Sequence, residues 1–226
     1  MDFANESDAI FVAYGWSHYA RNELLKSTRG YINGISGKWS SLFQRINPEK
    51  LSSEHTVYTS LEKLNSYIKS HNYRLTSDKT QLLNYTTDEV NLNKMNKAIT
   101  ANTVTLPYGN VTTVFKYDKN TKEYVKYVND KEVKDHKTKE KITTKNIIIH
   151  KLTYRMAADK YYWHLNTTGK GDGYYITNGY AVPIKWSKSN RNAQTKYTYL
   201  DGKEIDVNDG RTYIEIHTTK KKHSIK

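Results

Sequence analysis

The sequence contains no cysteine, which excludes disulfide bonds, cysteine-ligated zinc and thiol catalysis. It also lacks any apolar run close to the roughly 18 residues that a membrane-spanning helix needs. The first residues, Met1 to Glu6, are acidic and contain no apolar core of a secretory signal peptide. We therefore expect either a cytoplasmic protein or a segment of a longer precursor.

Apolar residues are also scarce, at 36% of the chain, so much of the core has to come from the 20 tyrosines. The net charge of +13 is uneven. Residues 1–100 carry 12 Lys and Arg against 10 Asp and Glu, whereas residues 101–226 carry 24 against 13, a net +11. Such asymmetry predicts an anionic partner for the second half, for which nucleic acid, an anionic membrane and acidic wall polymers all qualify. The alternative is that these lysines only keep the surface soluble.

The first half has the pattern of an α/β fold. Residues 9–13 form an unbroken apolar run that predicts a buried strand over residues 8–14, and residues 17–28 predict a helix capped by Ser17. A second helix is expected from Thr59, where Thr59 and Glu62 form a capping-box pattern, to about Ser70. The polar stretch 76–100 is interpreted as a linker or long surface connection.

From Thr103 onward the hydrophobic period is two, which predicts strands. Asn178-Gly179 predicts a tight hairpin, because a type I′ turn needs positive φ at both central positions, and Asp201-Gly202 predicts another turn. Pro183 cannot donate a ladder hydrogen bond, so its strand is expected to be an edge or to carry a bulge. The overall prediction is an α+β protein. A truncated α/β part with a linker (1–100) precedes a mostly antiparallel β domain (101–226), folded as a sandwich or half-barrel.

Several ordered segments then resemble a known family. They are Gly169-Lys170-Gly171-Asp172-Gly173-Tyr174, Asn178-Gly179, Ile184-Lys185-Trp186-Ser187-Lys188, Tyr199-Leu200-Asp201-Gly202-Lys203-Glu204-Ile205 and Gly210-Arg211-Thr212-Tyr213-Ile214. Together they are similar to the carboxyl-terminal domain of the YerB-type lipoproteins, a family of unknown function from Gram-positive bacteria. Asp8-Ala9-Ile10-Phe11-Val12 and Tyr58-Thr59-Ser60-Leu61-Glu62-Lys63-Leu64 resemble the end of that family's amino-terminal domain.

The resemblance implies an extracellular protein, lipid-anchored to the cell surface in its full-length form. The family's lipobox cysteine and long first portion have no counterpart here, so the chain corresponds to the last two-thirds of such a protein. Where the family has His-Ala-Gly-Gly-Ser this chain has Ala13-Tyr14-Gly15-Trp16-Ser17, and for Ala-Pro-His-Asn it has Ser53-Glu54-His55-Thr56. His55 therefore matches the histidine of the second family segment, whereas Ala13 stands where the first family segment has its histidine.

His55 and Arg45 are the candidate catalytic residues. A histidine before a helix can act as an acid or base near neutral pH, and an arginine can clamp a carboxylate or phosphate. The structural alternatives are that His55 pins its loop through a backbone hydrogen bond and that Arg45 is a solvated side chain.

Two groups of residues are binding candidates. Tyr14 and Trp16 follow the first strand and could stack on a sugar or base, or pack against the missing part. The second group is a basic, aromatic surface of the β domain. It comprises Tyr174, Lys185, Trp186 and Arg191, with Tyr175, Lys188, Tyr197 and Tyr199 nearby. Cations with stacking rings suit anionic, carbohydrate or single-stranded nucleic-acid ligands, but cross-strand tyrosine pairs under solvated lysines give the same pattern.

Other patterns favour structural roles. The glycine run from Gly169 to Gly173 enters a strand and lacks a following Lys-Ser/Thr pair, so a bulge or turn is expected rather than a phosphate loop. His150 and His164 would face each other across neighbouring strands, but no third ligand is spaced for a metal, and neither metal nor cofactor is expected. The run Lys220 to Lys222 is interpreted as a frayed tail.

The first hypothesis for function is a non-enzymatic binding or scaffold module for an anionic or glycan envelope component, such as a cell-wall polymer, or for an envelope protein. One alternative is an envelope hydrolase or transferase that uses His55 and Arg45 with groups from the missing segment. The other is a nucleic-acid binder, although no specific nucleic acid is expected. Membrane attachment is expected only through the absent lipid anchor. An uncovered strand would allow a homodimer.

Overall fold

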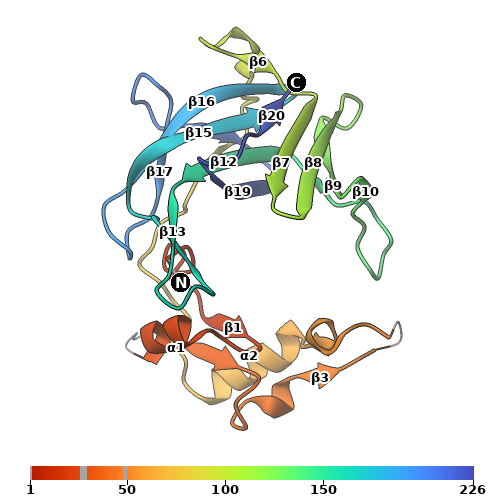
Figure 1. The fold of residues 1–226 in the computed structure, drawn as a ribbon, viewed down its shortest axis with the longest axis vertical. Coiled ribbons are helices and arrows are strands. Elements are labelled where there is room, and N and C mark those ends of the chain that lie inside the picture. The colour runs from red at the N-terminus through yellow and green to blue at the C-terminus, as the bar shows by residue number, and fades with distance from the viewer. Residues whose placement is uncertain (1, 26–29, 48–49) are drawn as a thin grey trace. The chain divides into compact units, whose positions relative to one another are not determined.

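A computed structural model describes residues 2–25, 30–47 and 50–226. The chain divides into two compact units, residues 1–80 and residues 81–226 (Figure 1). We call them the amino-terminal unit and the β domain. The boundary lies 20 residues before the one expected from sequence, because the segment interpreted as a linker supplies two strands to the β domain.

The amino-terminal unit combines two small sheets with two helices. Its helices are α1 (His18–Leu25) and α2 (Leu61–Ser70), its 3-10 turns are η1 (Ser40–Leu42) and η2 (Ser53–His55), and its strands are β1 (Phe11–Ala13), β2 (Tyr31–Asn33), β3 (Gln44–Arg45) and β4 (Val57–Tyr58). Strands β1 and β2 pair in parallel, and β3 pairs antiparallel with β4. Ile32, Trp39, Leu64 and Ile68 form the buried core of this unit.

Helix capping follows the sequence prediction at one helix and departs from it at the other. The amide of Ala20 donates to Ser17 Oγ (3.2 Å), as expected for the start of α1. At α2 the capping residue is Ser60, whose Oγ accepts from the Lys63 amide at 3.2 Å. The expected cap, Thr59, instead donates to the Leu42 carbonyl (2.8 Å) and so ties the helix start to the preceding segment.

The β domain contains most of the strands. They are β5 (Asn84–Thr86), β6 (Ile99–Thr100), β7 (Thr103–Tyr108), β8 (Val111–Asp118), β9 (Glu123–Val128), β10 (Lys131–Glu132), β11 (Thr143–Thr144), β12 (Asn146–Leu152), β13 (Tyr154–Met156), β14 (Trp163–Leu165), β15 (Gly169–Thr177), β16 (Tyr180–Lys188), β17 (Lys196–Thr198), β18 (Asp206–Asn208), β19 (Thr212–Thr218) and β20 (Ser224–Ile225), with the 3-10 turn η3 (Leu92–Lys94).

Two six-stranded sheets organise this domain (Figure 1). The first has the order β10-β9-β8-β7-β20, with β11 also paired to β9. The second has the order β17-β16-β15-β12-β19, with β6 also paired to β16. Most pairs are antiparallel, and β12–β19 is a parallel exception. Strands β13–β14 and β18–β5 form separate two-stranded sheets.

Both faces of the second sheet are buried. One face shares a core with the first sheet through residues such as Phe115, Tyr124, Ile147 and Ile149. The other face is also buried, at Ile148, Tyr175, Val182, Ile184, Trp186, Tyr197, Ile205 and Val207. Strand β12 is therefore buried at nearly every position, as expected for a sheet covered on two sides.

The coarse fold prediction is confirmed: the protein is α+β and its second part is strand-rich and mostly antiparallel. The distinction between a sandwich and a half-barrel stays a prediction. The Asn178-Gly179 turn has the expected positive φ angles of 51° and 79° and joins β15 to β16. The lysine run is not a frayed end, because the amide of Thr219 bonds to Leu152 and β20 pairs with β7 beyond it.

Candidate functional site

An open pocket of about 430 Å³ lies beside β16 in the β domain. Strand β6 pairs with β16 only at Tyr180 and Ala181, and β17 pairs only from Lys185 to Ser187. Among the described residues, Val182 and Pro183 therefore have no neighbouring strand on this side, and both line the pocket. Pro183 has no N–H to leave unsatisfied, which suits it to an unpaired stretch.

The pocket has an apolar floor and polar walls. One wall is the segment Val90, Asn91, Met95 and Asn96, and the other is the turn Tyr199, Leu200, Asp201, Lys203 and Asp206. Aromatic and aliphatic surface with a few amides and carboxylates is the usual lining of a small-molecule site, and the volume is within the usual range of several hundred Å³.

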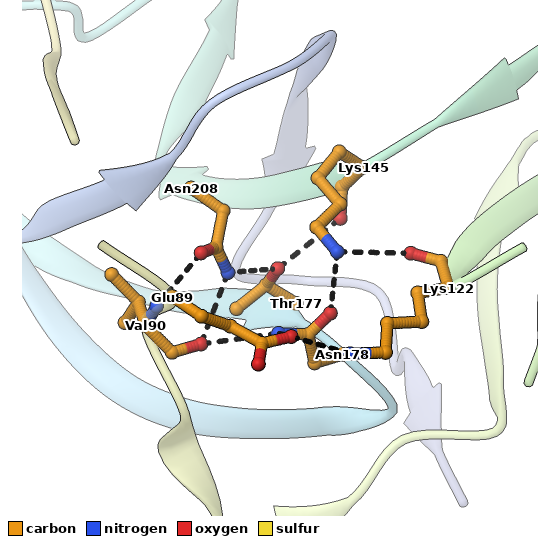
Figure 2. Close-up of polar contacts among 7 residues, drawn as sticks. All are labelled: Glu89, Val90, Lys122, Lys145, Thr177, Asn178 and Asn208. Atoms are coloured by element: carbon orange, nitrogen blue, oxygen red, sulfur yellow. Dashed lines mark hydrogen bonds and ion pairs between the residues drawn. The ribbon is translucent and has the colours of Figure 1, made fainter. Parts of the chain in front are cut away.

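The first wall is fixed at Val90 (Figure 2). The Val90 amide donates to Asn208 Oδ1 (2.8 Å), and Asn208 Nδ2 donates back to the Val90 carbonyl (3.0 Å). Asn178 Nδ2 donates to the same carbonyl at 3.2 Å. Asn208 Nδ2 also donates to Thr177 Oγ1 (2.9 Å), so the wall is attached through Asn208 of β18 to β15 of the second sheet.

Charged groups extend this network (Figure 2). Lys145 Nζ donates to Asn178 Oδ1 at 2.6 Å and to the Lys122 carbonyl at 3.4 Å. Lys122 Nζ bonds to Glu89 Oε1 at 2.9 Å, which holds the pKa of the Glu89 carboxyl below its usual value. Burial lowers the pKa of Lys145. Asn178 thus forms the hairpin turn and also anchors Glu89 and Val90, at the start of the first wall of the pocket.

The second wall is a compact turn. The Tyr199 amide donates to the Lys203 carbonyl (2.8 Å), and the Lys203 amide donates to Asp201 Oδ1 (3.0 Å). Gly202 has φ of +89°, a value that favours glycine, in agreement with the Asp201-Gly202 turn predicted from sequence. Lys203 Nζ lies 3.6 Å from Asp206 Oδ2, so this wall carries two carboxylates and one ammonium.

Tyr199 is the most unusual side chain of the pocket. Its hydroxyl is buried and makes no hydrogen bond of normal geometry within the described part of the chain. Burial raises the pKa of Tyr199 to about 12, the nearby Asp206 carboxylate adds to the increase, and the Asp206 backbone amide opposes it. Because this hydroxyl has almost no accessible surface, a ligand in the pocket would have to displace neighbouring side chains to reach it, and would then supply the missing partner.

The predicted basic, aromatic surface does not form one exposed patch, because the register of β15 and β16 puts Tyr174 and Lys185 on one face of the second sheet and Trp186 on the other. Lys185 is exposed and forms an ion pair with Asp172 beside a shallow hollow, and Arg191 is exposed on the following loop. Tyr174 is half-buried against the core shared by the two sheets. Their common binding role stays a prediction.

Trp186 lies in the core and not on that surface. It is 3% exposed, and its Nε1 donates to the Lys151 carbonyl at 2.8 Å. Its ring stacks on buried His150 at 4.2 Å, and His150 Nδ1 is 3.0 Å from the Tyr197 hydroxyl. A side chain on Gly171 would collide with this indole, which explains one glycine of the run.

The prediction that His150 and His164 face each other across neighbouring strands is also wrong. His150 lies opposite Gly173 in β12–β15, whereas His164 lies opposite Arg155 in β13–β14. Searching the residues that the structure describes reveals no group of three histidine, aspartate or glutamate side chains that could hold a metal.

In the amino-terminal unit, Arg45 lies close to Tyr14 and to the turn that carries His55, whereas Trp16 does not join them. The Arg45 guanidinium lies 5.4 Å from the Tyr14 ring centre, and its Nη1 donates to the Ser53 carbonyl and to Thr56 Oγ1 (2.9 Å). It thereby fixes the turn that carries exposed His55. Trp16 packs elsewhere, at 5.5 Å from the Tyr31 ring. Catalysis by His55 and Arg45 stays a prediction.

Sequence reasoning missed the first wall of the pocket. The stretch 84–96 is rich in asparagine and threonine, and such composition is common to linkers and to polar ligand sites. The available signal was Asn178, whose turn was recognised but whose side-chain partners 88 and 89 residues earlier were not.

Comparisons with known proteins find a family model for part of the β domain and a relative that matches most of the chain. Residues 103–214 match the carboxyl-terminal domain of a protein family of unknown function, DUF3048. The chain is 27% identical over 221 residues to YerB of Bacillus subtilis strain 168, which is named as a lipoprotein. The match covers 96% of this chain and 63% of YerB, so the chain spans less than two-thirds of that relative.

The crystal structure of Bacillus subtilis YerB has the same fold, with a TM-score of 0.78 at 22% identity. The superposition covers 99% of this chain and 73% of the YerB chain. No helix within residues 2–25, 30–47 and 50–226 is long and apolar enough to cross a bilayer.

Proposed function

Because the chain is a YerB homologue with a DUF3048 carboxyl-terminal domain, we propose that it is a sugar-binding module of a cell-surface lipoprotein. The pocket beside Tyr199 is its ligand site. The observation that carries this proposal is the buried, weakly partnered Tyr199 hydroxyl in a pocket of about 430 Å³. The lipoprotein name of YerB supports the extracellular surface as the location.

The lining suits a sugar ring. Sugars present apolar C–H faces together with many hydroxyl groups. Pro183 and Met95 offer apolar surface to such a face, while Asn91 and Asn96 can donate and accept hydrogen bonds. The Tyr199 hydroxyl would then gain the hydrogen bond that it lacks within the protein, and the ligand would compensate for its burial.

The charged residues that line the pocket determine which sugars would fit it. Asp201 and Asp206 outnumber Lys203 in the lining, although the β domain as a whole is basic. Lys203 is also close to Asp206, at 3.6 Å, so little positive charge is left for a ligand. We therefore expect a neutral or amine-bearing envelope sugar in this pocket, and not an anionic polymer or nucleic acid.

Calorimetric titration with three tetrasaccharides tests the proposal. The probes are the tetramers of N-acetylglucosamine, which is neutral, of glucosamine, which is cationic, and of galacturonic acid, which is anionic. The first two are expected to bind saturably and the third weakly or not at all. Tightest binding by the anionic probe, or binding by none of the three, would contradict the proposal.

Two variants locate the site. Tyr199→Phe should weaken binding about fivefold, the effect of one hydrogen bond of about 1 kcal/mol. It should not lower the free energy of unfolding, because the hydroxyl makes no normal hydrogen bond in the free protein. Tyr127→Phe, on β9, is the matched control and should bind like the unmodified protein. Equal affinities for both variants would place binding outside this pocket.

A further inference from the structure

Strands β13 and β14 form a two-stranded ribbon separate from both large sheets (Figure 1). Tyr154 lies opposite Leu165 and Met156 lies opposite Trp163, while Arg155 pairs with His164 between them. Because directly opposed residues share a face and successive residues alternate, the register puts Tyr154, Met156, Trp163 and Leu165 on one face. The ribbon is therefore amphipathic.

The apolar side of the ribbon is exposed. Met156 is 48%, Trp163 53% and Leu165 43% exposed, and Tyr161 in the connecting turn is 86% exposed. With Tyr162 at 42%, five of the 17 large apolar side chains that the described chain exposes lie within these ten residues. Soluble proteins rarely concentrate apolar surface in this way without a partner.

The turn is ordered by specific hydrogen bonds. The Ala157 amide donates to the Tyr162 carbonyl (2.8 Å), and Asp159 Oδ1 accepts from the amides of Tyr161 (3.0 Å) and Tyr162 (3.3 Å). At the base of the ribbon, the Asn166 amide donates to the Thr153 carbonyl at 2.9 Å. The aromatic side chains are thus presented by a defined backbone.

The flanking charge is positive. Arg155 and Lys160 belong to the ribbon, and Lys220 Nζ lies 4.9 Å from the Tyr154 ring centre. Asp159 is the single acidic residue between Tyr154 and Leu165, and its carboxylate is engaged with the turn amides. Tryptophan and tyrosine beside lysine and arginine are the side chains enriched where a protein meets a bilayer surface. Cationic residues there are attracted to anionic headgroups.

We propose that the ribbon 154–165 docks on the surface of an anionic lipid bilayer. Trp163, Tyr161 and Met156 enter the headgroup region, and Arg155 and Lys160 contact lipid phosphates. A glycan is a poorer occupant, since Met156 and Leu165 offer no hydrogen bonds to hydroxyl groups. The lipoprotein name of YerB supports a nearby membrane. This contact is additional to any lipid anchor and independent of the proposed sugar site.

Vesicle sedimentation with the whole chain tests the proposal. Binding to vesicles of phosphatidylcholine mixed with phosphatidylglycerol is expected, with little binding to phosphatidylcholine alone. Replacing Tyr161 and Trp163 together by serine should lower the partition coefficient at least about tenfold, since two exposed aromatic side chains no longer leave water. Replacing Tyr58 and Leu61 by serine removes exposed apolar surface from the amino-terminal unit and should leave binding unchanged.

Two further readouts do not depend on those substitutions. Bromine-labelled lipids should quench tryptophan fluorescence, and Trp163→Tyr should bind normally but lose most of the quenching. Arg155→Gln combined with Lys160→Gln should weaken binding to anionic vesicles. The proposal is overturned by equal binding to both vesicle types, by quenching that survives Trp163→Tyr, or by light scattering that shows a dimer lost in the Tyr161 and Trp163 variant. The last result would identify a second copy as the occupant.

Discussion

Val90 and Asn208 are joined by a reciprocal pair of hydrogen bonds between segments 118 residues apart in sequence. The Val90 amide donates to the Asn208 side-chain oxygen, and the Asn208 side-chain nitrogen donates to the Val90 carbonyl. An extended backbone offers this donor and acceptor together, and a buried carboxamide matches both. The pair holds one wall of the candidate pocket on the second sheet.

Asn208→Asp should lower the free energy of unfolding by about 2–4 kcal/mol. The carboxylate still accepts from the Val90 amide, but it cannot donate to the Val90 carbonyl or to Thr177, and Asn208 is only 3% exposed. Urea denaturation measures the effect. Asn190→Asp is the control, because exposed Asn190 accepts from two backbone amides and an aspartate can do the same. Equal stability of Asn208→Asp and the unmodified protein would show that the pair contributes nothing.

Asn178 has two separable roles, in the turn and in the network. Asn178→Gly keeps the positive φ but removes the bonds to Lys145, Glu89 and Val90, and should cost about 1–2 kcal/mol. Asn178→Ala should cost about 1 kcal/mol more, because alanine resists φ of 51°. Denaturation of both variants gives the two contributions. A glycine variant as stable as the unmodified protein would assign Asn178 to the turn alone.

The buried His150 makes stability depend on pH. Burial and the charge of Lys188 lower the pKa of His150 to about 4, against about 6.5 in an unfolded chain. Below pH 6.5 the unfolded state therefore binds the proton more readily. Stability should fall as the pH drops from about 6.5 to about 4, by about 3 kcal/mol at most. The lowered pKa values of His217 and His223 act in the same direction.

Denaturation curves between pH 4.5 and 7 report on His150, His217 and His223 together, since carboxylates with lowered pKa values act at more acidic pH, and a variant separates the share of His150. His150→Asn keeps a polar atom near the Tyr197 hydroxyl but cannot take up a proton. Its stability should vary less steeply with pH than that of the unmodified protein, whatever its absolute stability. Parallel pH profiles would mean that another group titrates.

Arg45 is expected to support structure in the amino-terminal unit. Arg45→Lys loses the planar group that bonds to Ser53 and Thr56 and lies over Tyr14, and should cost about 1 kcal/mol. Hydrogen exchange should accelerate in residues 53–58. His55→Ala, at an exposed position of the same turn, should change stability by less than about 0.5 kcal/mol. Unchanged exchange in Arg45→Lys would indicate that the turn is held by other contacts.

Local signals in the sequence predicted local structure well. Asn178-Gly179 and Asp201-Gly202 are turns as expected, because their φ angles depend on the residues themselves. Helix α2 was predicted with its cap one residue too early, since Thr59-x-x-Glu62 and Ser60-x-x-Lys63 both offer a hydroxyl at the helix start. Pro183 was expected at an edge or a bulge, and it lies in an inner strand where two short neighbours leave a gap.

Long-range packing could not be predicted from the same signals. Trp186 was placed on the surface because lysines flank it, but the register puts it on a sheet face that the chain covers elsewhere. The ribbon 154–165 was not predicted as a hairpin, because its turn contains no asparagine-glycine signal. The candidate pocket also combines segments about 100 residues apart, which no local pattern connects.

Nuclear magnetic resonance titration with the N-acetylglucosamine tetramer tests the central claim most directly. The side-chain amide signals of Asn91 and Asn96 report on one wall of the pocket, and the backbone amides of Tyr199 to Lys203 report on the other. The account predicts saturable shifts confined to these groups, and a midpoint of the titration at about fivefold higher ligand concentration in Tyr199→Phe. Shifts centred elsewhere on the chain, or none with this probe and the glucosamine tetramer, would contradict it.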